Sequence, residues 1–190
     1  MRTYFQFNLR SYAIIRAKEG DSAWKHIKKI KSLWSLLVIL SNTLVFKKLG
    51  NIPQHHYSTR MEHSINVAYT SYKIAKKIGW DEKSTARGGL LHDFFYYDWR
   101  ETKFNKGHAW VHPRIAVRNA RKLTTLNKRE EDIILKHMWG ATIAPPRYKE
   151  GYIVTMVDKY WAVKEAITPF RNRFGKKRRY SRKILPSNHR

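Results

Sequence analysis

The sequence predicts an all-α protein, and three observations lead to this prediction. Apolar residues recur at helical spacing, for example between residues 154 and 165. The spacing of a helix-capping box occurs twice, with Thr59 three residues before Glu62 and Asn127 three residues before Glu130. No segment shows the alternation typical of strands, and no internal repeat is present. We expect six or seven helices.

Length and composition indicate one soluble domain. The 190 residues can form one substantial core, and 42% hydrophobic with 28% charged residues is typical of a globular chain. There is no cysteine, which excludes disulfides and thiolate metal sites. Any transition metal must therefore be held by nitrogen and oxygen atoms. This composition is compatible with a reducing compartment, and we expect a cytoplasmic protein.

The charge is strongly basic, at +25 from 39 Lys and Arg against 14 Asp and Glu. Residues 171–190 contain nine Lys or Arg and no acid, which predicts a flexible basic C-terminal tail. A field of this size attracts polyanions, so RNA or another anionic surface is a candidate partner of the tail. A basic charge with no specific partner is an equally weighted interpretation.

Residues 1–50 are expected to form a helical extension packed on the core. Apolar residues recur at helical spacing from residue 27 onward, and a largely apolar run covers 33–46. This run is too short and too polar to span a membrane, and it lacks the pattern of a signal peptide. We therefore interpret it as a core helix, with an amphipathic helix lying on a membrane as the alternative.

The next two helices are predicted from their ends. One is expected at residues 60–78, with Gly79 where a C-terminal cap belongs. Asp81 can cap the following helix, which reaches His92 and Asp93 near its end. The Gly88–Gly89 pair weakens this helix, and a close approach of another helix is the simplest compensation.

Three further boundaries follow. Pro113 after His112 suits the first position of a helix. Asn127 is expected to begin a helix that carries His137 on an apolar face. Residues 144–146 mark a loop before the last helix.

Asp158 is the first residue that calls for a chemical explanation. It shares a helical face with Val154, Val157 and Trp161. A buried carboxylate without a partner costs several kcal/mol or becomes protonated, so it needs a cation, a hydrogen-bonding network or a metal ion. A salt bridge to one of the many Lys or Arg residues is the simpler explanation for Asp158 alone.

Several histidines raise the same question. His92 and Asp93 lie within an apolar run, where surface polarity or a cap is the alternative. His63 and His137 share helices with apolar residues, and a lone histidine there is more often a satisfied core residue than a ligand. His112 could equally belong to a helix end.

One metal centre explains all of these residues together. The candidate ligands are His63, His92, Asp93, His112, His137 and Asp158. Imidazole and carboxylate ligands suit Fe, Mn, Co, Ni or Zn better than an all-oxygen Mg site. Six ligands exceed what one open catalytic ion needs, so two ions bridged by a carboxylate fit the number better.

The order of these residues resembles the HD superfamily of metal-dependent phosphohydrolases, whose minimal pattern is H…HD…D. The local contexts MEHSINVA, GGLLHDFFYYDW, VHPRIA, ILKHMWG and IVTMVDKYWAV are similar to the family's corresponding helices. The resemblance implies a single HD-type helical domain at residues 51–170, between the extension and the basic tail. More broadly, the chain resembles small bacterial HD proteins, a group that implies no particular substrate.

The resemblance also implies an activity. It is the hydrolysis of a phosphomonoester, phosphodiester or pyrophosphate bond in a nucleotide or other phosphorylated substrate by a metal-activated hydroxide. The Asp158–Lys159 pair is similar to the symmetrical dinucleoside-tetraphosphatase branch. The chain departs from the HD-GYP branch because Met138, and not a second histidine, follows His137 and because the GYP signature is absent.

The resemblance assigns roles to individual residues. His63, His92, Asp93 and Asp158 would hold a first ion, and Asp93 would bridge to a second ion at His112 and His137, which makes His92 and Asp93 catalytic. The candidate substrate-binding residues are Lys159, Arg87 and His108. Lys159 and Arg87 could equally be solvated charges, and this is the favoured interpretation of Arg60. The alternative function is a basic RNA- or membrane-associated binding module in which the HD site is structural or regulatory.

Overall fold

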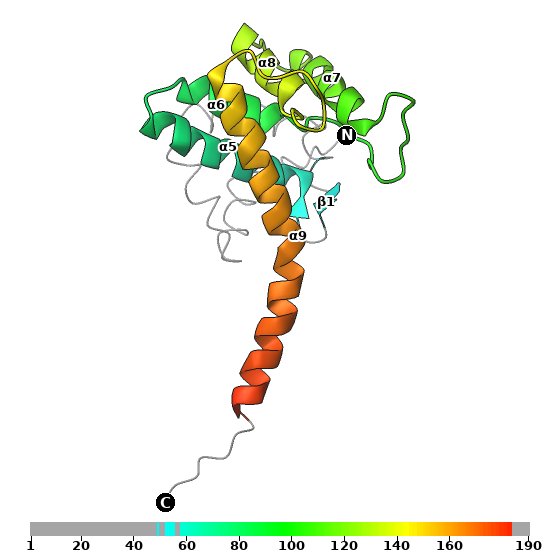
Figure 1. Cartoon of the computed structure of the whole chain (residues 1–190). Helices are drawn as coiled ribbons and strands as arrows, with labels where there is room; N and C mark the ends of the chain where they lie inside the picture. The colour runs from blue at the N-terminus through cyan, green and yellow to red at the C-terminus, as the bar shows by residue number, and fades with distance from the viewer. Residues whose placement is uncertain (1–48, 50–51, 56–57, 184–190) are drawn as a thin grey trace, which may run out of the picture.

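A computed structural model describes Leu49 and residues 52–55 and 58–183 (Figure 1). Its elements are β1 (Pro53–His55), β2 (Ser58–Thr59), α5 (Arg60–Lys77), α6 (Glu82–Leu91), α7 (His108–Arg121), α8 (Lys128–Lys136) and α9 (Lys149–Lys183). The predicted all-α fold is confirmed. Five helices fall within the described part of the chain, and the predicted N-terminal extension lies outside it, apart from Leu49.

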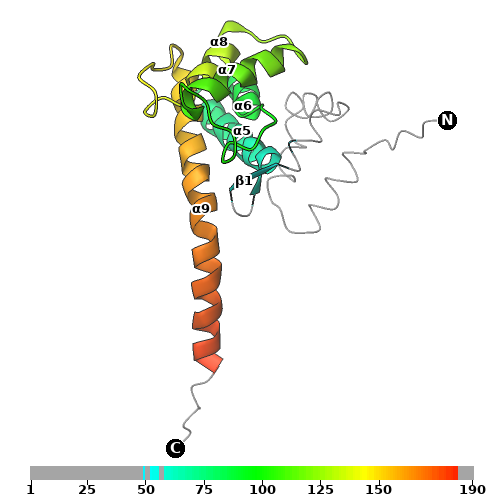
Figure 2. The same cartoon turned by 90° about the vertical axis from the view of Figure 1, so that its right-hand side faces the viewer.

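The helices form a bundle in which α9 is the longest element. It packs on α5, α6 and α8, while α6 lies along α5 and α7 packs on α8. Figures 1 and 2 show that α9 crosses the body and continues well beyond it. No helix in the described part of the chain is long and apolar enough to cross a membrane.

Local signals in the sequence fix the helix starts. Both predicted capping boxes are present: Thr59 and Glu62 exchange hydrogen bonds at the start of α5, and Asn127 and Glu130 do so at the start of α8. The predicted Asp81 cap of α6 is confirmed, because its carboxylate accepts from the backbone N–H of Ser84. Such caps stabilise a helix by about 1 kcal/mol each.

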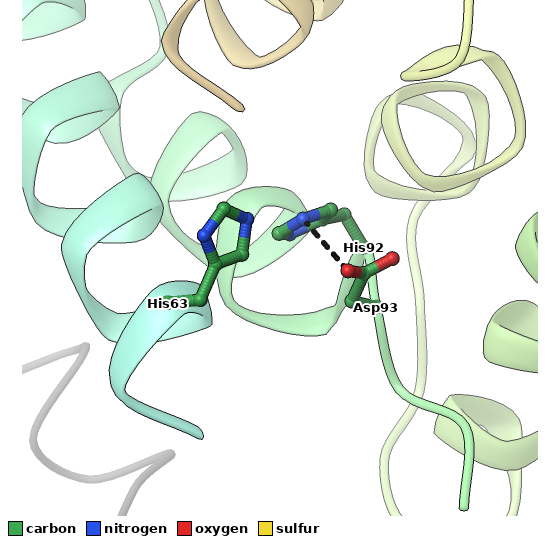
Figure 3. A group of neighbouring side chains, drawn as sticks. All are labelled: His63, His92 and Asp93. Carbon is green, nitrogen blue, oxygen red and sulfur yellow. Dashed lines mark ion pairs between the residues drawn. The ribbon is translucent and has the colours of Figure 1, made fainter. Parts of the chain in front are cut away.

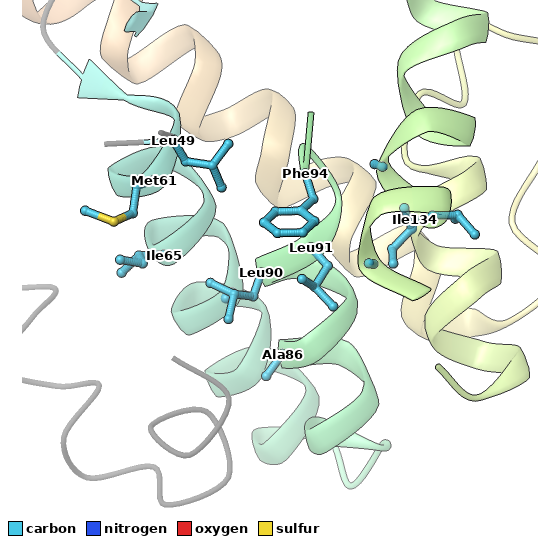
Figure 4. Packing of buried hydrophobic residues seen from close by; sticks show 12 residues of the cluster. Leu49, Met61, Ile65, Ala86, Leu90, Leu91, Phe94 and Ile134 are labelled. Atoms are coloured by element: carbon cyan, nitrogen blue, oxygen red, sulfur yellow. The ribbon is translucent and has the colours of Figure 1, made fainter. Parts of the chain in front are cut away.

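The core lies between α5, α6, α7 and α8 (Figure 4). Its buried residues include Leu49, Leu90, Phe94 and Ile134. The close helix packing expected from the paired glycines is confirmed. A Cβ atom at Gly88 would lie 2.6 Å from Ile133 of α8, and one at the next position would lie 3.2 Å from the α5 backbone.

The start of α7 differs from the prediction. The helix begins at His108, one turn before the His112–Pro113 pair, so the prediction of Pro113 at the first position is wrong. Gly107 has a φ of +75°, which L side chains rarely adopt, and this turn starts the helix. Pro113 then lies inside α7, where it has no N–H to donate to the carbonyl group of Ala109.

Two other features go beyond the prediction. β1 and β2 pair antiparallel, although the sequence shows no alternation there. α9 continues to Lys183, so the helix includes most of the segment for which a flexible tail is expected. Residues 184–190 lie outside the described part of the chain.

Candidate metal centre

The structure brings together six His and Asp side chains from separate helices. They are His63 in α5, His92 and Asp93 at the end of α6, His112 in α7, His137 at the end of α8, and Asp158 in α9. Within three overlapping groups of them, one possible ligand atom per residue lies within 4.8 Å of the others. Figure 3 shows His63 facing His92 and Asp93 across the space between α5 and the end of α6.

One half of the centre surrounds Asp158. Its Oδ1 lies 2.9 Å from His63 Nε2 and 3.4 Å from His92 Nε2. The His92 Nε2 atom also lies 3.6 Å from Asp93 Oδ2. This half therefore combines two imidazoles with oxygen atoms of two carboxylates.

The other half surrounds the second oxygen of Asp93. Its Oδ1 lies 3.3 Å from His112 Nε2 and 3.7 Å from His137 Nε2. The two Nε2 atoms lie 2.8 Å from one another. Asp93 thus presents one oxygen to each half of the centre.

Backbone carbonyl groups set the orientation of three imidazoles. His92 Nδ1 donates to the Gly89 carbonyl oxygen at 2.7 Å. His112 Nδ1 donates to that of His108 at 2.9 Å, and His137 Nδ1 to that of Ile134 at 2.8 Å. A neutral imidazole with its proton on Nδ1 carries a lone pair on Nε2. All three Nε2 lone pairs therefore point into the centre, the arrangement by which histidines ligate metal ions.

These nitrogen atoms fit a cation. Among the described residues, the buried Nε2 of His92 has no hydrogen-bond partner. The Nε2 lone pairs of His112 and His137, at 2.8 Å, repel one another unless a proton or cation lies between them. A divalent ion beside His92 would satisfy its Nε2 atom, and one between His112 and His137 would remove the repulsion of their lone pairs, so the residues present can hold divalent ions.

The electrostatics agree with a site for positive charge. Burial alone would raise the pKa of Asp93 and Asp158, but the surrounding histidines hold both pKa values well below the usual range. Burial opposes protonation of His63, yet hydrogen bonds to Asp158 and Glu165 raise its pKa to about 10. Burial and the neighbouring imidazoles lower the pKa of His137 to about 3.

Glu165 supports the first half from outside, a role for which the sequence contains no direct signal. Its Oε2 lies 3.2 Å from His63 Nδ1 and accepts a 2.6 Å hydrogen bond from Ser58 of β2. A carboxylate on the far nitrogen of a ligating histidine fixes the ring and raises its basicity. The available clue is spacing, because Glu165 lies seven residues after Asp158 on the same helical face.

The interpretation of Arg60 as a solvated charge is wrong. Its side chain is fully buried, and Nη1 donates to the carbonyl oxygens of Phe95 and Tyr97 at 2.9 and 3.1 Å. The guanidinium lies over the Phe95 ring, 3.7 Å from its centroid. Arg60 therefore fixes the chain immediately after the His92–Asp93 pair.

The three candidate substrate-binding residues fall in different places. His108 stacks on His112 with ring centroids 4.3 Å apart, at the edge of the centre. Lys159 follows Asp158 on α9 and donates to the Trp139 carbonyl oxygen at 2.6 Å. Arg87 lies between α6 and α8, where its Nε donates to Glu130 at 2.6 Å. The structure does not bring Arg87 together with the others.

An open hollow of about 630 Å³ lies between the start of α7 and the turn after α8. Its lining residues are Lys106, Ala109, Trp110, Ala141, Thr142 and Ile143. Ala109 lies three residues before His112 on α7, and three and four residues apart define neighbours on a helix face. Both walls of the hollow thus come from segments that carry ligands of the second half.

Comparison with known proteins agrees with this geometry. The family model described as HD domain matches residues 60–170, which include all six residues of the centre. No curated protein and no solved structure matches the chain significantly. The match extends over more than half of the sequence and confirms the resemblance, so the chain belongs to the HD domain family.

Proposed function

We propose that this protein is a metal-dependent phosphohydrolase that uses two divalent transition-metal ions. The observation that carries the proposal is the convergence of four imidazoles and two carboxylates in one buried centre. HD domains bind divalent metals and are generally hydrolases, which supports the same class of activity. Four imidazole nitrogen donors favour Fe, Mn, Co, Ni or Zn over Mg.

The division of Asp93 between the two halves supports two ions. Its Oδ2 faces His92, whereas its Oδ1 faces His112 and His137. His63, His92 and Asp158 would complete the first site. A carboxylate with its two oxygens turned to different imidazole sets is suited to bridge two ions.

The chain's own residues then have separate tasks. When bound, the ions supply Lewis acidity, which polarises a phosphoryl oxygen and lowers the pKa of water from about 15.7 toward 7. His92 and Asp93 would hold the ions. Asp158 is the most exposed member of the centre, with 14% of its side chain accessible, so the first half opens to solvent at that residue.

The substrate would be a nucleotide or another phosphorylated small molecule. The hollow beside α7 offers room for the part of the substrate that does not react, and its residue Lys106 is a cation for a phosphate group. His108 and Lys159 border the centre and are the better-placed of the predicted substrate contacts. A cysteine-free chain with this chemistry suits the cytoplasm.

Metal content and hydrolysis together test the proposal. We would purify wild type, Asp93→Ala and Asp98→Ala without chelator, determine bound metals by elemental analysis, and assay phosphorylated nucleotides with Mn or Fe added. Asp98 is the matched control because its carboxylate binds Arg100 in the loop and not the histidines. We expect about two ions and hydrolysis in wild type and Asp98→Ala, and neither in Asp93→Ala.

Two results would overturn the proposal. The first is a wild type that contains no transition metal and takes up none when Mn, Fe or Zn is added. The second is a metal-loaded wild type that hydrolyses no phosphate ester or anhydride across nucleotides and simple aryl phosphates. That outcome would favour a structural or regulatory metal site.

A further inference from the structure

A stripe of exposed apolar side chains runs along α9 on the face turned away from the bundle. We call it the α9 stripe; it consists of Tyr152, Met156, Tyr160, Val163 and Ile167. Each side chain is between 38% and 62% exposed. Their spacing of four, four, three and four residues keeps them on one helical face over about 22 Å. Single exposed apolar residues need no explanation, but a continuous stripe does.

The charges of α9 are distributed unevenly about this stripe. The helix contains three acidic residues, and all three face the protein body: Glu150 and Glu165 are buried, and Asp158 belongs to the metal centre. The sequence of α9 contains eleven Lys and Arg residues. Lys159 and Lys164 flank the stripe on opposite sides, as the helical repeat requires. The outward side of α9 is therefore apolar and basic.

A partner that covers this face must offer apolar surface and negative charge together. A second copy of the chain brings the same basic residues and would be repelled. The first 48 residues are basic as well, with ten Lys or Arg against two acids. Nucleic acid supplies charge, but Met156, Val163 and Ile167 have no ring on which a base could stack.

We propose that the α9 stripe binds an anionic lipid surface. The boundary between headgroups and acyl chains accepts aliphatic side chains, and tyrosines prefer that depth because one end is apolar and the other polar. Phosphate headgroups attract Lys164 beside the stripe and the basic segment that follows it. The helix needs no rearrangement for this contact, since α9 already projects from the body (Figure 2).

The test compares two matched double variants of the full-length protein. Val163→Ser/Ile167→Ser removes two branched aliphatic side chains, four residues apart, from the stripe. Ile74→Ser/Ile78→Ser removes two others at the end of α5, which are also four residues apart and 39% and 46% exposed. We would measure co-sedimentation with vesicles of phosphatidylcholine mixed with phosphatidylglycerol, and with vesicles of phosphatidylcholine alone.

We expect wild type to bind only the mixed vesicles, and the stripe variant to bind them about tenfold more weakly. The α5 variant should bind like wild type, and all three proteins should contain the same amount of metal. That readout separates this proposal from the proposed enzymatic function, because folding and metal binding are checked independently of lipid.

Several results would overturn the lipid proposal. One is a wild type that does not sediment with the mixed vesicles, and another is equal binding of the two double variants to them. A dimeric wild type that becomes monomeric in the stripe variant would assign the stripe to a second copy of the chain. If high salt abolished vesicle binding of wild type and of the stripe variant equally, electrostatic attraction alone would explain the binding.

Discussion

The two halves of the metal centre hold positive charge in different ways. The first half has Asp158 beside His63 and His92, and Glu165 stands behind His63. The second half has no carboxylate to itself among the described residues: it shares Asp93 with the first half, and His137 also belongs to a candidate group with Asp158. The pKa values follow this division, since that of His63 is raised to about 10 and that of His137 is lowered to about 3.

This difference predicts an order of ion binding. Negative charge makes the first half the stronger cation site, but a proton on His63 competes there with the metal. In the second half, burial and the neighbouring imidazoles lower the pKa of His137, so no proton competes with the metal at that ring, but less negative charge is available there. We expect the first half to bind its ion more tightly and the second half to depend on Asp93.

Asp158→Asn should have the largest effect on activity. The amide keeps the size of the side chain and removes the charge on which the first half depends. We expect loss of the first ion and a fall in kcat of at least about a thousandfold. Elemental analysis and steady-state kinetics check this outcome. Retention of both ions at wild-type affinity would show that the carboxylate does not distinguish the halves.

His112→Gln should separate the halves. The second half loses a nitrogen donor, so the number of bound ions should fall from two to one, and kcat by about a hundredfold. His108→Gln is the control on the same helix, since His108 stacks on His112 but belongs to no ligand group. If both variants lose the same ion, stacking and not ligation explains the effect.

Glu165→Gln should weaken only the first half. Loss of the carboxylate behind His63 should lower the affinity of the first ion about 10- to 100-fold, as observed for such supporting groups elsewhere. Glu150→Gln is the matched control: it alters another buried glutamate of α9, which binds Arg129 instead of a histidine. This control should lower the melting temperature without changing metal affinity, whereas an equal loss of affinity in both variants would assign Glu165 a purely structural role.

Proton release should distinguish the halves in the same titration. The ordinary pKa of histidine is 6.5, and that of His63 in the metal-free fold is about 10, so its ring is protonated at neutral pH. The first ion should therefore release about one proton and bind about tenfold more tightly per unit of rising pH. The raised pKa also stabilises the metal-free fold below pH 6.5, a contribution lost as pH rises to about 10.

Calorimetry in two buffers of different ionisation enthalpy measures this release. Glu165→Gln should reduce it, because one of the two hydrogen bonds that raise the pKa of His63 is weakened. Identical heats in the two buffers for wild type would contradict the protonated His63.

The sequence predicted those features that depend on interactions between residues close together in the chain. Caps at Thr59, Asp81 and Asn127 are decided within one turn. The six clustered His and Asp residues could be predicted because most lie on or beside apolar helix faces and because their order resembles the HD superfamily. Contacts between distant segments were not readable in this way. Glu165 meets His63 and Ser58 across more than a hundred residues, and Arg60 is buried because its guanidinium finds carbonyl groups over thirty residues later.

The prediction of where α7 starts was wrong for a related reason. Proline at a first helical position is a preference, and it competes with the turn at Gly107, whose positive φ is invisible in a one-dimensional pattern. The five extra residues at the start of α7 matter for the site, because they bring His108 onto the ring of His112.

The smallest effect on the centre should come from Gly88→Ala, which tests whether both halves rely on the same support. A Cβ atom there would lie 2.6 Å from Ile133 Cγ2, so α6 and α8 must separate slightly. We expect a loss of about 1–3 kcal/mol in the free energy of unfolding. His92 and Asp93 directly follow α6, and His137 directly follows α8. The shift should therefore weaken the binding of both ions to a similar, small extent.

Gly79→Ala is the comparison for that variant. Its φ is +71° but the space around it is open, so it should cost about 1 kcal/mol through backbone strain alone and leave metal affinity unchanged. Chemical denaturation with metal titration of both variants makes the distinction. If Gly88→Ala lowered the affinity of one ion and left that of the other unchanged, the halves would differ in their dependence on helix packing as well as in their charge.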